Sequence, residues 1–143
     1  MTLSRLLALI GVALLVLITN VAASVLYMVL YGHVIDPGHD PAYYQDHIQF
    51  AAPYCSIGAG IPIMFFAGWW VAGWWRQVLN YRGAILVWLA YTIVDLSILL
   101  IAGLSLGVGL LFMVSFATKL AAVYWGAALR LRNHAKRVTI EIT

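Results

Sequence analysis

The stretch from Ala84 to Leu129 reads AILVWLAYTIVDLSILLIAGLSLGVGLLFMVSFATKLAAVYWGAAL, and it is apolar almost throughout. A helix needs roughly 20 residues to cross the hydrocarbon core of a bilayer, so this stretch is too long to be a single span. Gly103, Gly107 and Gly109 lie near its middle and are typical of a tight turn. We predict a turn near Gly107, which divides the stretch into two spans of similar length.

Two further apolar runs precede this stretch. They extend from about Leu6 to Tyr31 and from Phe50 to Trp75. The 143 residues are 64% hydrophobic and only 9% charged, whereas the surface of a soluble domain carries far more charge. The sequence therefore predicts an all-α integral membrane protein, a single-domain four-transmembrane-helix bundle. Its spans are expected at about residues 6–31, 50–75, 84–106 and 108–129.

The charges at the ends of the spans predict the orientation. Asp36, Asp40 and Asp46 lie in the loop 32–48, which contains no Lys or Arg. The basic residues at the opposite ends of the spans are Arg5, Arg76, Arg82, Arg130, Arg132, Lys136 and Arg137. Because basic residues favour the cytoplasmic side, we expect both termini, including the basic tail 130–143, in the cytoplasm and the loop 32–48 outside, in a cytoplasmic (inner) membrane. Orientation accounts for the basic residues, so the lipid bilayer, and no nucleic acid, is the expected partner.

Each end of the chain admits a second interpretation. Arg5 and the apolar run up to Val21-Ala22-Ala23 are typical of a cleavable secretory signal, but the run continues to Tyr31, so we expect an uncleaved span. Val138 to Thr143 alternates apolar and polar residues, a pattern that could add a strand to the sheet of a partner.

Two charged residues, Asp95 and Lys119, fall inside the apolar spans. With a rise of ~1.5 Å per residue, both lie near the middle of the bilayer and at matching depth on adjacent antiparallel helices. Asn20 falls at a similar level, and Thr92 and Ser115 lie one turn from the two charges. We call these five residues the polar layer.

Three interpretations of the polar layer are open. A charge in the hydrocarbon core costs at least ~2.5 to 3.5 kcal/mol on insertion scales, so such residues are functional by default and suggest a proton or ion relay, or a substrate site. Asp95 and Lys119 could instead form a buried ion pair that fixes helix packing. Either charge could also pair with another protein.

The outside loop holds three histidines and two carboxylates that suit a divalent metal. The ligands would be His33, His39 and His47, with Asp36 or Asp46 as the fourth. Their spacing matches no defined metal motif. Alternatively, Asp36 before Pro37 and Asp40 before Pro41 could cap turns and helices, the loop could dock a partner, or its histidines could sense pH.

Two patterns in the second span concern packing and the membrane interface. Small residues at four-residue spacing, which let helix backbones approach closely, are Ala52, Ser56 and Gly60. Indole rings at the end of the span, expected as anchors at the headgroup level, are Trp69, Trp70, Trp74 and Trp75. The alternative for some of these rings is that they line a pigment, sterol or quinone site.

The chain has no phosphate-binding loop and no recognisable set of catalytic residues, which favours a non-enzymatic role. We expect a solute or ion transporter, or a small subunit of a larger membrane complex, that works through the polar layer. Four spans enclose little volume, so a transporter is expected to be a homo-oligomer. The alternative is a membrane metalloprotein or metalloenzyme with a His/Asp site in the outside loop.

Overall fold

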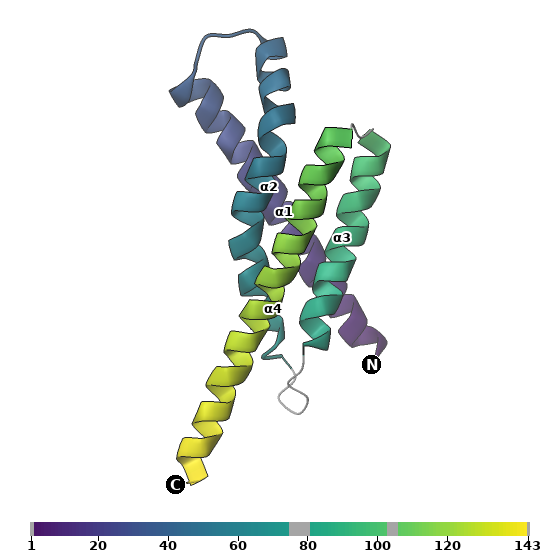
Figure 1. Ribbon diagram of the computed structural model, residues 1–143, viewed down its shortest axis with the longest axis vertical. Coiled ribbons are helices and arrows are strands. Elements are labelled where there is room, and N and C mark those ends of the chain that lie inside the picture. Colours follow the sequence, from purple (N-terminus) through teal and green to yellow (C-terminus); the bar gives the residue numbers. More distant parts are fainter. Residues whose placement is uncertain (1, 75–80, 103–105, 143) are drawn as a thin grey trace.

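The computed structural model describes residues 2–74, 81–102 and 106–142, and these residues are helical almost throughout. The helices are α1 (Leu3–Leu30), a π-helical turn η1 (Tyr31–Ile35), α2 (Pro41–Val71), α3 (Arg82–Ala102) and α4 (Leu106–Ile142). Four of them, α1 to α4, are long and apolar enough to span a membrane. They run up and down, with both ends of the chain at the end opposite the α1–α2 connection (Figure 1). The expected all-helical architecture is confirmed for the described residues.

The connection between α1 and α2 is shorter than the predicted loop 32–48. The π-helical turn extends α1 to Ile35, and α2 begins at Pro41. The Asp40 carboxylate caps α2 by accepting a hydrogen bond of 2.9 Å from the Tyr43 backbone N–H, and proline favours the first helical position. Gly38 has a φ of 95°, which glycine adopts without strain. The predicted capping role of Asp40 is confirmed.

The predicted turn near Gly107 needs correction. Gly107 and Gly109 lie inside α4, which begins at Leu106, so the chain turns before Gly107. Gly103 lies outside the described residues. The C-terminal segment that could add a strand to a partner continues α4 as helix up to Ile142, because extending an existing helix adds one hydrogen bond per residue whereas a lone strand has no partner.

Helices α2 and α4 approach each other at backbone contact. A Cβ atom added at Gly68 would overlap the Val123 carbonyl, and one added at Gly126 would overlap the Phe65 carbonyl. Small residues at such crossings are the usual means by which apolar helices pack in a bilayer, where dispersion contacts replace the hydrophobic effect. The two glycines therefore fix the separation of this helix pair.

The tightly packed core occupies only one half of the bundle. On α1 the buried apolar residues lie between Leu9 and Leu17, and on α2 most lie between Met64 and Ala72. On α3 they lie between Ala84 and Tyr91. All of these segments belong to the half nearer the chain ends, which we call the basic end. At the other half, the acidic-loop end, the α1–α2 pair separates from the α3–α4 pair (Figure 1).

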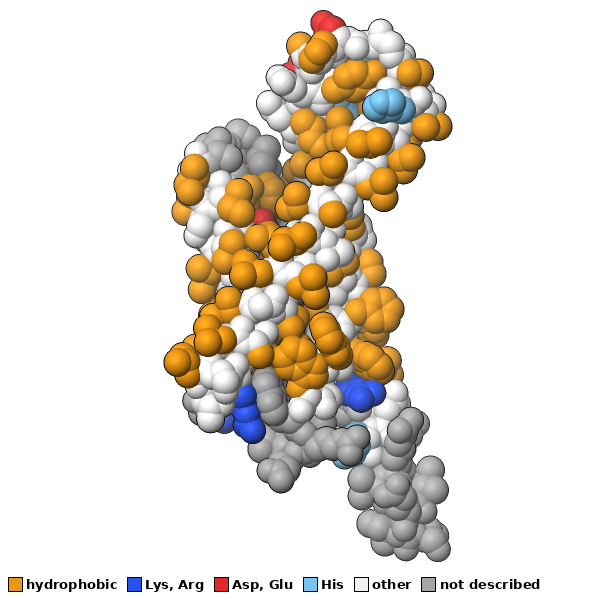
Figure 2. All heavy atoms as spheres, turned by 180° about the vertical axis from the view of Figure 1, so that it is seen from behind, with side chains coloured by type: hydrophobic (Ala, Val, Ile, Leu, Met, Phe, Trp, Pro, Cys, Tyr) orange, Lys and Arg blue, Asp and Glu red, His pale blue; other side chains and the backbone are white. Residues whose placement is uncertain are grey.

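The two ends of the bundle differ in charge. Acidic and histidine side chains gather at the tip of the α1–α2 pair, and Lys and Arg side chains gather at the opposite end (Figure 2). Between the tip and the shorter α3–α4 end the surface is hollowed. The charge separation is the one from which the orientation was predicted.

Candidate functional site

The centre of the bundle holds a hydrogen-bonded cluster with one residue from each of the four long helices. The Lys119 ammonium on α4 donates to the Ser56 hydroxyl on α2 at 2.8 Å and to the Tyr91 hydroxyl on α3 at 2.7 Å. The Asn20 amide on α1 donates to the same two oxygens at 3.1 and 3.3 Å. We call Asn20, Ser56, Tyr91 and Lys119 the Lys119 cluster.

Every member of the Lys119 cluster is buried. The exposed fraction is 0% for Lys119, 1% for Tyr91, 5% for Asn20 and 7% for Ser56. Gly60, on the same face of α2 as Ser56, provides the space, because a Cβ atom there would overlap the Lys119 Cε atom. The ammonium also lies 4.7 Å from the centre of the Tyr91 ring, within the range of a cation–π interaction.

The structure does not support the direct ion pair expected between Asp95 and Lys119. No ion pair within 4.0 Å joins these two residues, both of which the structure describes, and the ammonium donates to Ser56 and Tyr91. Asp95 follows Tyr91 by four residues on α3, so both lie on one face of that helix. The Asp95 carboxylate is half-buried, and its Oδ2 atom has no hydrogen-bond partner.

The buried side-chain atoms that lack a partner coincide with the polar layer. Within the described residues they are Asn20 Oδ1, Thr92 Oγ1, Asp95 Oδ2 and Ser115 Oγ. A buried polar atom without a hydrogen bond costs ~1 to 3 kcal/mol, so such atoms are rare in stable cores. Four of the five predicted polar-layer residues thus offer hydrogen-bonding capacity that the fold itself does not use.

A broadly open cavity of about 680 Å³ extends from the acidic-loop end to this polar centre. Its end nearest the acidic loop, which we call the mouth, is lined by His33 and Gln45. Its inner end is lined by Asn20, Ser56 and Asp95, which come from three different helices. The cavity occupies the half of the bundle where the two helix pairs separate, and a smaller one of about 380 Å³ lies between α1 and α2 in the other half. We call the larger one the interhelical cavity.

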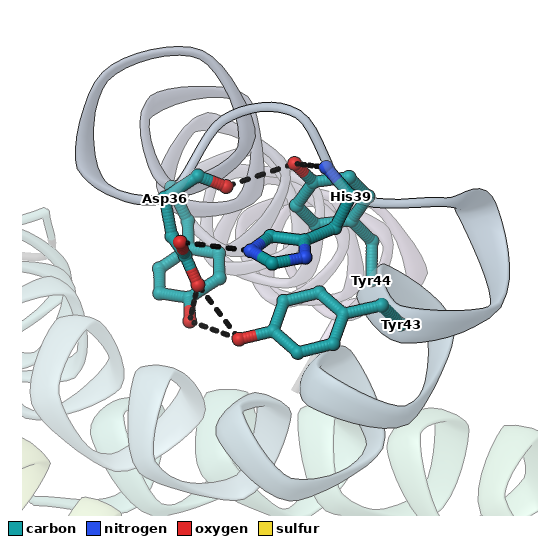
Figure 3. Close-up of polar contacts among 5 residues, drawn as sticks. Asp36, His39, Tyr43 and Tyr44 are labelled. Carbon is teal, nitrogen blue, oxygen red and sulfur yellow. Dashed lines mark hydrogen bonds and ion pairs between the residues drawn. The ribbon is translucent and has the colours of Figure 1, made fainter.

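A second polar cluster lies at the tip of the α1–α2 pair, centred on Asp36 (Figure 3). One carboxylate oxygen lies 3.0 Å from His39 Nε2, and the other accepts from the Tyr43 hydroxyl at 2.7 Å and from the Tyr31 hydroxyl at 3.2 Å. The Tyr44 hydroxyl donates to the Asp36 carbonyl at 2.8 Å. These bonds, first that of Tyr43 and next that of His39, lower the pKa of the Asp36 carboxyl below its usual value of 3.8.

The predicted metal ligands do not converge. Among the side chains that the structure describes, those of residues 2–74, 81–101 and 109–134, there is no group of three His, Cys, Asp or Glu that could hold a metal ion. His33 Nδ1 lies 3.0 Å from the Val29 carbonyl, and His47 Nε2 lies 3.1 Å from the Tyr27 hydroxyl. His47 also stacks on Tyr31, with ring centroids 3.8 Å apart. Asp46 is exposed, so His39 and Asp36 are the only two of the five predicted ligands that the structure brings together.

The row of small residues on α2, which is Ala52, Ser56 and Gly60, and the tryptophans near its end lie in different surroundings. Gly60 is buried, Ser56 belongs to the Lys119 cluster, and Ala52 is half-buried beside the interhelical cavity. The half-buried Trp69 ring carries the Arg130 guanidinium 4.6 Å from its centre. Trp70 is half exposed and meets Trp74 edge to face. Trp75 lies outside the described residues.

Sequence reasoning missed Tyr91, and it assigned Ser56 to helix packing without its hydrogen bonds to Asn20 and Lys119. A tyrosine in an apolar span is an ordinary core residue, and a serine in a row of small residues is typical of helix packing. The available signal was the spacing of four between Tyr91 and Asp95, which places a phenol next to a carboxylate on one helix face.

Comparisons of the chain with models of known protein families, with curated proteins and with solved structures find no match.

Proposed function

We propose that this protein is an integral membrane transporter that takes a small solute into the interhelical cavity and releases it past the Lys119 cluster. The observation that carries the proposal is a cavity of about 680 Å³ that ends on Asn20, Ser56 and Asp95 at the middle of helices long enough to span a membrane. The charge bias favours an orientation with both termini in the cytoplasm and the cavity open to the outside.

The distribution of packing along the bundle supports transport rather than a simple pore. Towards the basic end, the backbone contacts at Gly68 and Gly126 hold α2 against α4, and a smaller cavity of about 380 Å³ lies between α1 and α2. The larger cavity at the acidic-loop end would be the outward-facing state of an alternating-access cycle, with the binding site near the midplane. Moving one helix pair against the other would open the opposite side.

The cost of the buried lysine also supports a functional centre. A lysine at the centre of a membrane helix is unfavourable by ~2.5 to 3.5 kcal/mol on insertion scales. Lys119 is fully buried, and its ammonium donates hydrogen bonds to Ser56 on α2 and to Tyr91 on α3. An apolar side chain would fill the same space without that cost, so the cluster is retained for its polarity.

Cysteine accessibility tests this proposal without knowledge of the solute. Cys55 is the single cysteine, so a Cys55→Ala variant provides a cysteine-free background. Ser24→Cys and Ala52→Cys place thiols in the cavity wall, and Leu26→Cys, which is exposed but outside the cavity, is the matched control. A membrane-impermeant maleimide is applied to vesicles of either orientation.

The expected result is reaction of the two cavity thiols from the outside and little reaction at Leu26→Cys, because lipid covers that position. A Ser56→Cys variant should also react from the cytoplasmic side in a fraction of molecules. Reaction from one side only would refute transport. Cavity thiols that react after purification but not in native membranes would instead show a small subunit whose partner occupies the cavity.

A further inference from the structure

We infer that the interhelical cavity selects a monovalent organic cation, an ammonium or amidinium head with an apolar body, and that Asp95 and Asn20 hold the head. This inference rests on the proposed function, because it names the class of solute that the same cavity takes. It follows from the chemistry of the cavity wall, from the atoms at its inner end that lack a hydrogen-bond partner, and from the position of Lys119.

The cavity is amphipathic along its length. Between the mouth and the polar end its wall is formed by apolar side chains, among them Val21, Val25, Met28 and Phe112. The polar end is formed by Asn20, Ser56 and Asp95. A ligand that matches this wall has an apolar body and a polar head that reaches the middle of the bundle.

The unused atoms at the polar end are hydrogen-bond acceptors. Asn20 is only 5% exposed, and its Oδ1 atom has no partner because its amide nitrogen makes the contacts to Ser56 and Tyr91. Asp95 Oδ2 also has no partner. Both atoms are buried in this structure, and both accept hydrogen bonds and donate none, so a ligand head that reaches them must supply the donors.

The ionisable side chain at the polar end of the cavity is an acid, Asp95. Asp95 lines the cavity, whereas Lys119 is not part of its wall and is 0% exposed. The ammonium of Lys119 is also bonded to Ser56 and Tyr91, which face it from α2 and α3. A cationic head therefore meets the Asp95 carboxylate, whereas an anionic head would face the same carboxylate and the Asn20 carbonyl oxygen.

Binding of a matched set of three amphiphiles tests the inference. The probes are a medium-chain alkylammonium, the alcohol of equal chain length and the carboxylate of equal chain length. Each is titrated calorimetrically into the full-length protein in nanodiscs of zwitterionic lipid, and binding to empty nanodiscs is subtracted. We expect the ammonium to bind at least ~10-fold more tightly than the alcohol, and the carboxylate more weakly still.

Three variants test which part of the protein determines the preference for the ammonium. Asp95→Asn should abolish the preference for the ammonium over the alcohol. Asp46→Asn removes an exposed carboxylate at the acidic-loop end that does not line the cavity, so it should leave the preference unchanged. Ala52→Trp fills the cavity while keeping Asp95, so it should weaken all three ligands. This third variant keeps the test decisive if Asp95→Asn does not fold.

The outcomes separate the inference from the proposed function. Equal binding of all three probes, abolished by Ala52→Trp, would overturn the cation preference and leave cavity binding intact. Tighter binding of the carboxylate, or the same preference in Asp95→Asn, would overturn the inference as well. If no probe binds, the solute class is wrong, and the cysteine accessibility of the cavity decides the proposed function independently.

Discussion

Gly60→Ala should destabilise the protein strongly, although alanine is the better helix former. An added Cβ atom at residue 60 would overlap Lys119 Cε, and it would lie 3.2 Å from Lys119 Nζ and 3.4 Å from Asn20 Oδ1. The lysine side chain cannot move into open space because it is 0% exposed. Either α2 shifts away from α4, or Lys119 gives up a hydrogen bond.

The expected loss follows from these two alternatives together. Overpacking a core costs ~1 to 3 kcal/mol, a lost hydrogen bond to a charged group costs ~1.5 to 3 kcal/mol, and the helix gains ~0.5 to 1 kcal/mol from alanine. The net decrease in the free energy of unfolding is therefore about 0.5 to 2.5 kcal/mol if one of the two costs arises and about 1.5 to 5.5 kcal/mol if both do. Thermal unfolding in detergent, followed by the fluorescence of the six tryptophans, measures it.

Gly58→Ala is the matched control on the same helix. Nothing lies within 4 Å of a Cβ atom at residue 58, so this variant should gain ~0.5 to 1 kcal/mol instead of losing stability. In a Lys119→Val background, which lacks the overlapping carbon, Gly60→Ala should cost far less than it does alone. Equal stability of the Gly60→Ala variant and the wild type, or no coupling to Lys119, would refute the described packing of the lysine.

Three further predictions follow from other contacts. Tyr91→Phe removes an acceptor that serves both the lysine and the asparagine of the cluster, so the free energy of unfolding should fall by ~1.5 to 3 kcal/mol in the same assay; an unchanged value would mean that the phenol is dispensable. Gly126→Ala should weaken the α2–α4 contact, measured as a lower unfolding temperature, whereas Gly109→Ala, with nothing within 4 Å, should not. Because the pKa of Asp36 is lowered, the contribution of its carboxylate to stability is complete above pH 3.8 and is lost as the pH falls through the lowered pKa. A pKa at or above 3.8, measured by an NMR titration of this carboxyl, would contradict the contacts in Figure 3.

The division of the chain into four helices was predictable, because apolar length can be counted along the sequence. The stretch from Ala84 to Leu129 does contain two helices. The position of the turn was not predictable from glycine alone. Glycine is tolerated inside apolar helices, since neighbouring helices use it for close contact, and Gly107 and Gly109 are examples of glycine inside a helix.

The hydrogen-bond partners of Lys119 could not be predicted from the depth of each residue along its helix. Counting residues places Asp95, Asn20 and Lys119 at a common level, but it does not give the rotation of each helix about its axis. The observed rotation turns Tyr91 and Ser56 towards the ammonium and Asp95 towards the cavity. The sequence therefore singled out Asn20 and Lys119, which the structure brings into one cluster, but it did not predict their hydrogen-bond partners.

The same limitation explains the histidines of the loop. His33, His39 and His47 are close in sequence, but α2 begins at Pro41 and turns His47 towards Tyr27 and Tyr31 of the preceding helix. A helix that starts within a predicted loop separates side chains that a flexible loop would bring together. The cap by Asp40 and the proline after it carried that information in the sequence.

The order of the Lys119 cluster along the chain bears on how the protein is made. Asn20, Ser56 and Tyr91 are all synthesised before Lys119. If the helices enter a bilayer in chain order, as the proposed function implies, α4 inserts last, and the side chains that surround its lysine belong to helices made earlier. A substitution at Asn20, Ser56 or Tyr91 would then first appear as a failure of α4 to insert.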